Sequence, residues 1–118
     1  MGLQDLIDAG APVECSCEES FYGTQRDVMG EVVDHLVQEH NLFDVIEPPV
    51  QPKQARKNVL ISEKGVRIQQ YHPEKRNIQG EYELVTGHFL NTNYSKESKE
   101  RYLDSLAEGC GVKLKFSW

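Results

Sequence analysis

Cysteine is scarce in this chain, and long apolar runs are missing from it. The 118 residues include three cysteines and one tryptophan, and nowhere do they reach the roughly 20 consecutive apolar residues of a membrane-spanning helix. A small and odd number of cysteines argues against a disulfide framework and favours metal ligation or free thiols. The acidic N-terminus also lacks the basic start and apolar run of a secretory signal. We therefore expect a cytoplasmic protein without a membrane segment.

Common catalytic motifs are missing as well. The sequence has no Gly-rich phosphate loop, no nucleophile elbow and no Ser-His-Asp order. His72, His88 and Cys110 are isolated in the sequence, and each is more simply explained as an ordinary loop or core residue. The sequence therefore favours a non-enzymatic protein. A small enzyme with an unrecognised site near one of these three residues stays as the weakest alternative.

Charge is distributed unevenly along the chain. The formal net charge is −6, but residues 1–50 carry eleven acidic side chains against the single base Arg26, a net charge of −10. Residues 51–118 carry twelve basic side chains against eight acidic ones, a net charge of +4. The acidic half is thus suited to a basic partner surface, since complementary charge speeds and orients association.

The clearest predicted element is a helix over residues 25–40. Thr24 is a favourable N-cap, and apolar side chains follow it at helical spacing: Val28, Met29, Val32, Val33, Leu36 and Val37. The opposite face of this helix is mostly acidic. Before it, the pattern predicts a short helix at 3–9, an extended segment at 13–17 and a turn or second short strand at 18–23.

The second half changes to the alternating pattern of strands. We expect three strands, one helix and a final strand, at 58–62, 66–70, 81–86, 95–108 and 112–118. The predicted fold class is α+β, with a small zinc-stapled strand-turn-helix module and an antiparallel β-β-β-α-β module. The predicted boundaries are an acidic, zinc-finger-like module at 1–46, a proline-rich connector at 47–57 and the β-β-β-α-β module at 58–118.

Two cysteines and two histidines have the spacing of a metal site. Cys15 and Cys17 are one residue apart, so on a strand both side chains point to the same face. His35 and His40 lie in the last turns of the predicted helix with four residues between them, within the usual range for structural zinc. Two thiolates and two imidazoles suit tetrahedral zinc with no open position for catalysis.

An alternative without metal stays open for the same residues. Positions five apart lie about 140° around a straight helix, so His35 and His40 can bind one ion only if the last turn distorts. Otherwise Cys15 and Cys17 would be small core residues, His40 a packed core histidine and His35 exposed.

With Phe21 four residues after the second cysteine, residues 13–42 resemble a zinc finger of the two-cysteine, two-histidine kind. They are also similar to a family of small microbial domains of unknown function, whose strand-turn-helix layout ends in a paired-histidine helix. The chain departs from the finger pattern, because one residue separates the cysteines and seventeen separate Cys17 from His35, where fingers have about twelve. The acidic helix face would meet phosphates, so the resemblance implies the metal site and not DNA reading.

These observations favour a zinc-stabilised binding or regulatory protein that contacts a protein partner with a basic surface. The rival hypothesis is nucleic-acid binding through residues 53–76, where basic side chains lie beside an aromatic one. Its candidate residues are Lys53, Arg56, Lys57, Lys64, Arg67, Tyr71, Lys75 and Arg76. A sequence pI of about 5.2 argues against this rival.

Overall fold

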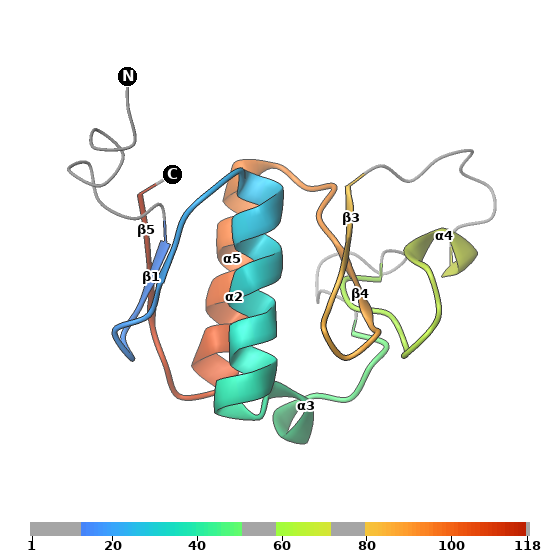
Figure 1. Ribbon diagram of the computed structural model, residues 1–118, viewed down its shortest axis with the longest axis horizontal. Coiled ribbons are helices and arrows are strands. Elements are labelled where there is room, and N and C mark those ends of the chain that lie inside the picture. The colour runs from blue at the N-terminus through green and yellow to red at the C-terminus, as the bar shows by residue number, and fades with distance from the viewer. Residues whose placement is uncertain (1–12, 51–58, 72–79, 118) are drawn as a thin grey trace.

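The computed structural model describes residues 13–50, 59–71 and 80–117 of the chain, and these form an α+β fold with two small antiparallel sheets. The predicted α+β class is confirmed, whereas the predicted β-β-β-α-β order of the second half is wrong. In Figure 1 the two long helices lie at the centre, with a three-stranded sheet on one side and a two-stranded hairpin on the other. The elements in chain order are β1 (Val13–Cys15), β2 (Ser20–Phe21), α2 (Gln25–His40), α3 (Leu42–Val45), α4 (Ile68–Tyr71), β3 (Glu81–Glu83), β4 (Phe89–Asn91), α5 (Lys96–Gly109) and β5 (Leu114–Phe116).

Helix α2 forms where the sequence predicts it. The Thr24 hydroxyl accepts a hydrogen bond from the Asp27 N–H at 3.2 Å, which satisfies one of the free donors of the first turn. The helix ends at Asn41, whose left-handed backbone lets its N–H donate to the Leu36 carbonyl. Five of the six predicted apolar residues are fully buried, and Val37 is partly buried against the same core. The five are Val28, Met29, Val32, Val33 and Leu36.

Helix α5 packs beside α2 and completes the core. The Ser95 hydroxyl caps its N-terminus by accepting from the Ser98 N–H at 3.3 Å. Leu103, Leu106 and Ala107 are buried and face the same cluster as the α2 stripe. The predicted helix at 95–108 is therefore confirmed within one residue at either end.

The last strand pairs differently from the prediction. We expected the strand at 112–118 to join the sheet of the second half, but β5 pairs with β1, in the register Val13–Phe116 and Cys15–Leu114. The sheet order is β2-β1-β5, so both ends of the described chain meet in one sheet. The reason is the path of the chain: leaving α5, it runs past the β1–β2 hairpin (Figure 1).

The middle of the chain also differs from the predicted strands. Residues 66–70 do not form a strand, because the Glu81 carboxylate accepts from the Ile68 N–H at 2.8 Å and the Gln70 side chain accepts from the Arg67 N–H at 2.8 Å. These local bonds close a helical turn, α4, and bury Ile68. In the expected strand at 58–62, the described residues make only isolated bridges, from Ile61 to Val50 and to Leu90.

A two-stranded hairpin stands in place of the predicted strand at 81–86. Only Glu81–Glu83 is extended there, as β3, and it pairs with β4, which we did not predict.

The structure bears on neither the predicted helix at 3–9 nor the connector residues 51–57, which lie outside the described residues. The predicted module boundaries stay a prediction, and residues of both halves contribute to one buried cluster. Among the described helices, none combines the length and apolar character needed to cross a bilayer.

Gly30 allows β3 to lie against α2. A glycine inside a helix costs about 1 kcal/mol relative to alanine, so its place in α2 needs a reason. A Cβ at this position would overlap the ring of Tyr82, which covers the helix there. The missing side chain therefore sets the approach of the β3–β4 hairpin.

Gly30→Ala is expected to lower the free energy of unfolding by about 1–3 kcal/mol, because the added methyl group displaces the Tyr82 ring. The measurement is urea denaturation followed by circular dichroism. Gly109→Ala is the matched control, since its Cβ would lie 3.4 Å from the nearest Val45 atom, an ordinary contact. A Gly30→Ala protein as stable as the wild type would contradict the close approach.

Candidate metal centre

A tight turn between β1 and β2 positions the two cysteines. The Cys15 N–H donates to the Glu19 carbonyl at 2.8 Å, and the Glu18 N–H donates to the Cys15 carbonyl at 2.9 Å. Glu18 has φ 78°, so residues 16–18 form a three-residue hairpin loop whose last residue is left-handed. The strand thus ends at Cys15, and Cys17 lies in the turn. The expectation that both cysteines share one face of a longer strand is wrong, and the turn brings them together instead.

The far end of the chain holds this turn in place. The Ser16 N–H donates to the Lys113 carbonyl at 2.8 Å, and the Lys113 N–H donates to the Ser16 hydroxyl at 3.1 Å. Phe21 of β2 is buried and meets the His35 ring edge-on, with centroids 5.4 Å apart. The hairpin therefore has contacts on both sides that do not depend on its cysteines.

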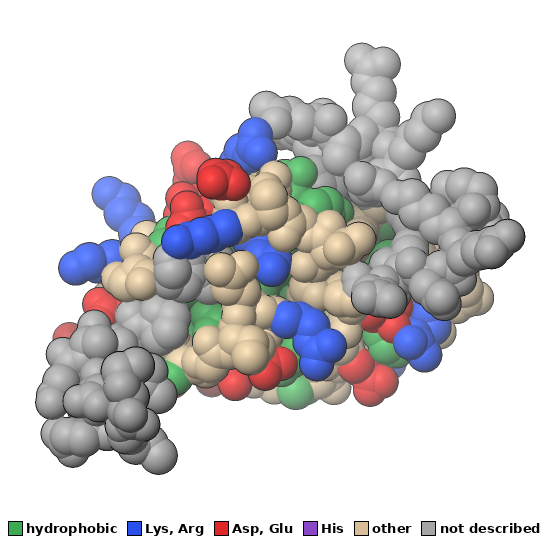
Figure 2. All heavy atoms as spheres, turned by 90° about the horizontal axis from the view of Figure 1, so that it is seen from above, with side chains coloured by type: hydrophobic (Ala, Val, Ile, Leu, Met, Phe, Trp, Pro, Cys, Tyr) green, Lys and Arg blue, Asp and Glu red, His purple; other side chains and the backbone are tan. Residues whose placement is uncertain are grey.

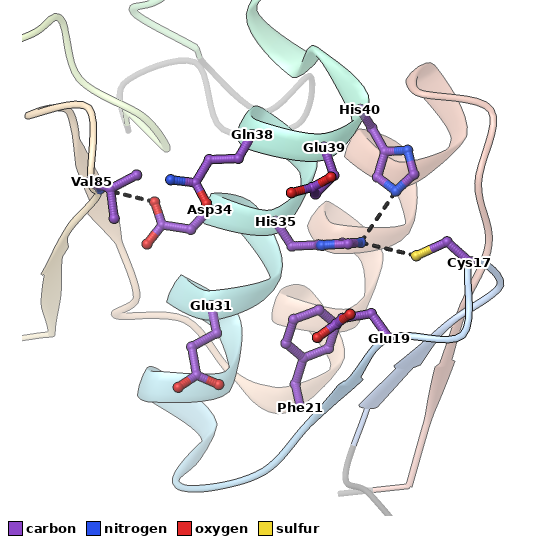
Figure 3. A pocket seen from close by; sticks show the side chains of 10 residues that line it. All are labelled: Cys17, Glu19, Phe21, Glu31, Asp34, His35, Gln38, Glu39, His40 and Val85. Carbon is purple, nitrogen blue, oxygen red and sulfur yellow. Dashed lines mark hydrogen bonds between the residues drawn. The ribbon is translucent and has the colours of Figure 1, made fainter.

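Helix α2 supplies the two histidines from its last turns. The Nε2 atoms of His35 and His40 lie 3.2 Å apart, and the Cys17 Sγ lies 3.0 Å from His35 Nε2. Figure 3 shows the His35 ring directed between Cys17 and His40. Helix α2 continues to His40, so the distortion that the helical wheel suggested is not required. The two histidine side chains are long enough for their Nε2 atoms to meet, although they start from different directions around the helix.

All four predicted residues come together at one point. One ligand atom from each of Cys15, Cys17, His35 and His40 lies within 4.8 Å of the others, so the cluster could hold a metal ion. Within the described part of the chain it is the only such group of three or more His, Cys, Asp or Glu side chains. Cys15 is buried, the two histidines are half-buried and Cys17 is exposed. The site therefore lies at the surface with one wall in the core.

Burial prepares one histidine for ligation. It lowers the pKa of His35 below its usual value, and the neighbouring His40 lowers it further, which favours the neutral imidazole that binds metals. Burial also raises the pKa of the Cys15 thiol, and a hydrogen bond with the Cys17 backbone opposes part of this rise. Without a metal, Cys15 is therefore protonated, and binding an ion there must release a proton.

A surface pocket of about 620 Å³ opens beside the cluster. Figure 3 shows its walls, which carry four carboxylates in addition to ligand residues: Glu19, Glu31, Asp34 and Glu39. Burial raises the pKa of Glu31, and Asp27 and Asp34 raise it further by repulsion. Burial likewise raises the pKa of Asp34, although its carboxylate accepts from the Val85 N–H at 3.0 Å. We call this feature the acidic pocket.

Two residues of the acidic pocket were not anticipated. The sequence predicted an acidic helix face but did not assign Glu19 and Glu39 to the site. Their position was the available signal, because Glu19 lies two residues after Cys17 and Glu39 directly precedes His40. Both carboxylates favour a positive charge at His35.

The nucleic-acid hypothesis falls mostly on residues that the structure does not describe. Lys53, Arg56, Lys57, Lys75 and Arg76 lie outside the described ranges, and Lys64, Arg67 and Tyr71 are described. The Arg67 guanidinium pairs with Glu81 and lies 5.0 Å from the centre of the Phe89 ring. The Tyr71 hydroxyl accepts from the Glu63 N–H at 3.0 Å. On the face shown in Figure 2, basic and acidic side chains are interspersed.

The other candidate residues lie apart from the cluster. The His88 ring packs at a tilt against Phe43, with centroids 4.5 Å apart, and its Nδ1 lies 2.7 Å from the Thr86 hydroxyl oxygen. Burial lowers the pKa of His88, and it raises the pKa of Cys110, which is half-buried after α5. Neither joins a group of metal-ligating side chains in the described chain. His72 lies outside the described residues.

Comparison of the chain with protein-family models, curated proteins and solved structures finds no match.

Glu18→Gly is expected to raise the free energy of unfolding by about 0.5–1 kcal/mol, because a left-handed backbone is unfavourable for a residue with a Cβ. Chemical denaturation in one buffer measures it. Glu19→Gly removes the same charge from a residue whose φ is not positive, and it should lower stability. If the two variants are equally stable, the strained turn is not the cause.

Proposed function

We propose that Cys15, Cys17, His35 and His40 bind a structural zinc ion. Two sulfur and two nitrogen donors are a common ligand set for structural zinc, and zinc bonds of about 2.0–2.3 Å give a tetrahedron with edges of about 3.3–3.8 Å. The 3.2 Å between the two histidine Nε2 atoms is close to such an edge, and the 3.0 Å between Cys17 Sγ and His35 Nε2 is shorter than one. All four donors lie within 4.8 Å of one another, so small side-chain movements would complete the tetrahedron. Four protein donors fill the coordination shell, so the ion would stabilise the fold and leave no position for a reactive water.

The location of the centre explains what zinc would stabilise. It would join the β1–β2 turn to the last turn of α2, and Cys17 has no place in the buried cluster that holds the rest of the fold. Structural zinc in small zinc-finger peptides contributes an apparent free energy of about 10–16 kcal/mol at neutral pH. A chain with a modest core gains stability from such a cross-link.

Purified protein is expected to contain one zinc ion per chain, measured by elemental analysis. Removing the ion with a chelator should lower the thermal midpoint, since a ligand at about 1,000 times its Kd stabilises the folded state by about 4 kcal/mol. Cys17→Ala and His35→Ala should lose the ion, whereas Cys110→Ala should keep it. A metal-free protein whose melting does not respond to chelator would refute the centre.

We propose further that the protein acts by binding a protein partner with a basic surface. The acidic pocket supports this, because its walls bring four carboxylates around one hollow beside the zinc ligands. The raised pKa values of Glu31 and Asp34 reflect burial that disfavours their charged forms. A lysine or arginine side chain placed among them would offset that cost and the repulsion between the carboxylates.

An apolar contact lies next to these charges. Val85 forms part of the pocket wall, is 63% exposed and is held to α2 by the hydrogen bond to Asp34. Charged residues at an interface guide association, and apolar contacts contribute burial. The proposed zinc centre needs reduced cysteines, which is consistent with the cytoplasmic location that the sequence predicts.

Neutralising the acidic pocket is expected to weaken binding of a fluorescent lysine-rich peptide, measured by anisotropy at two salt concentrations. The variant Glu31→Gln/Asp34→Asn/Glu39→Gln keeps side-chain size and removes three charges, so the affinity and its salt dependence should both fall. The matched control is Glu14→Gln/Glu97→Gln/Glu108→Gln, which removes three exposed charges elsewhere. Equal weakening by both triple variants would show that net charge, and not the pocket, attracts the peptide.

A further inference from the structure

The two thiols of the cluster differ sharply in exposure. Cys15 is 5% exposed and belongs to the core cluster, whereas Cys17 is exposed at the hairpin turn. Cys17 also lines the acidic pocket, where Figure 3 shows its sulfur at the edge of the site beside His35. A small molecule that enters the pocket therefore reaches the Cys17 sulfur without passing through the core.

Susceptibility to oxidation follows both exposure and thiolate character. Both cysteines would bind the same zinc ion, so exposure is what distinguishes them, and it favours Cys17. The four carboxylates of the acidic pocket repel anionic oxidants, but a hydroperoxide is small and neutral. A hydroperoxide therefore enters the pocket without electrostatic repulsion.

We infer that Cys17 is the oxidation-sensitive ligand of the centre, and that a hydroperoxide releases the zinc ion by oxidising it. This inference rests on the zinc centre proposed above. The Cys17 sulfur attacks the terminal peroxide oxygen and the O–O bond breaks, which gives a sulfenic acid that keeps the hydrogen of that oxygen. The alkoxide or hydroxide takes a proton from solvent and leaves as alcohol or water. The sulfur loses two electrons and the peroxide gains them. Two equivalents of a thiol then reduce the sulfenic acid to the original cysteine, giving a disulfide of the reductant and water.

The surrounding contacts confine the effect to the turn. β1 stays paired with β5, Ser16 stays bonded to Lys113, and Phe21 stays buried, because none of these contacts uses the Cys17 sulfur. What changes is the wall of the acidic pocket that Cys17, His35 and His40 form. Oxidation would therefore alter the proposed docking surface while the core remains folded.

The test treats zinc-loaded protein with hydrogen peroxide and follows free zinc with a chromogenic chelator. The wild type and Cys110→Ala should both release zinc. Cys17→His keeps four donors without an oxidisable sulfur at that position, and it should lose this release. In the wild type, a sulfenic-acid trap with peptide mass spectrometry should locate the first added oxygen at Cys17. Thiol reductant plus zinc should restore the metal, and far-ultraviolet circular dichroism should change little throughout.

Several results would overturn the inference. If zinc stays bound in peroxide, the proposed oxidative release is wrong but the zinc centre stands. If the protein holds no zinc before peroxide is added, both proposals are wrong. Release from Cys17→His at the wild-type rate, or a first oxygen on Cys15 or Cys110, would show that Cys17 is not the sensitive ligand. Mapping the oxygen in the wild type decides the question even if Cys17→His binds zinc poorly.

Discussion

Burial of the apolar stripe of α2 is the interaction on which the rest of the structure depends. Val28, Val32 and Leu36 are fully buried against α5 and its neighbours, which fixes the rotation of the helix about its axis. That rotation directs Glu31 and Asp34 outward into the acidic pocket and His35 toward the hairpin. One helix thus provides a central part of the core, two of the four residues of the cluster and most of the pocket wall.

The β1–β2 hairpin depends on contacts with residues near β5. Ser16 and Lys113 are far apart in sequence, yet their two hydrogen bonds hold the turn that carries Cys17. A left-handed Glu18 is the local cost of that turn. Pairing of β1 with β5 keeps the hairpin in place, so a metal ion would meet donors that are already close together and lose less free energy in ordering them.

Sequence reasoning predicted the elements whose signals are local. The capped, periodic pattern after Thr24 specified α2, and the spacing of Cys15, Cys17, His35 and His40 identified the cluster that the structure brings together. Its metal content stays a prediction.

Features that depend on distant contacts were not visible in the sequence. The pairing of β5 with β1 depends on the direction in which the chain continues after α5. The helical turn α4 depends on the Glu81 carboxylate, which lies thirteen residues beyond Ile68. The helical wheel treated His35 and His40 as fixed directions, although two flexible side chains bring their Nε2 atoms to 3.2 Å. Glu19 and Glu39 were missed although they lie close to Cys17 and His40 in the sequence, because that proximity does not show whether their carboxylates reach the pocket.

The most direct test of the zinc centre is X-ray absorption spectroscopy at the zinc edge of the purified, reduced protein. The account predicts two sulfur neighbours at about 2.3 Å and two imidazole nitrogens at about 2.0 Å. A first shell of oxygen and nitrogen alone, or one without imidazole, would contradict it.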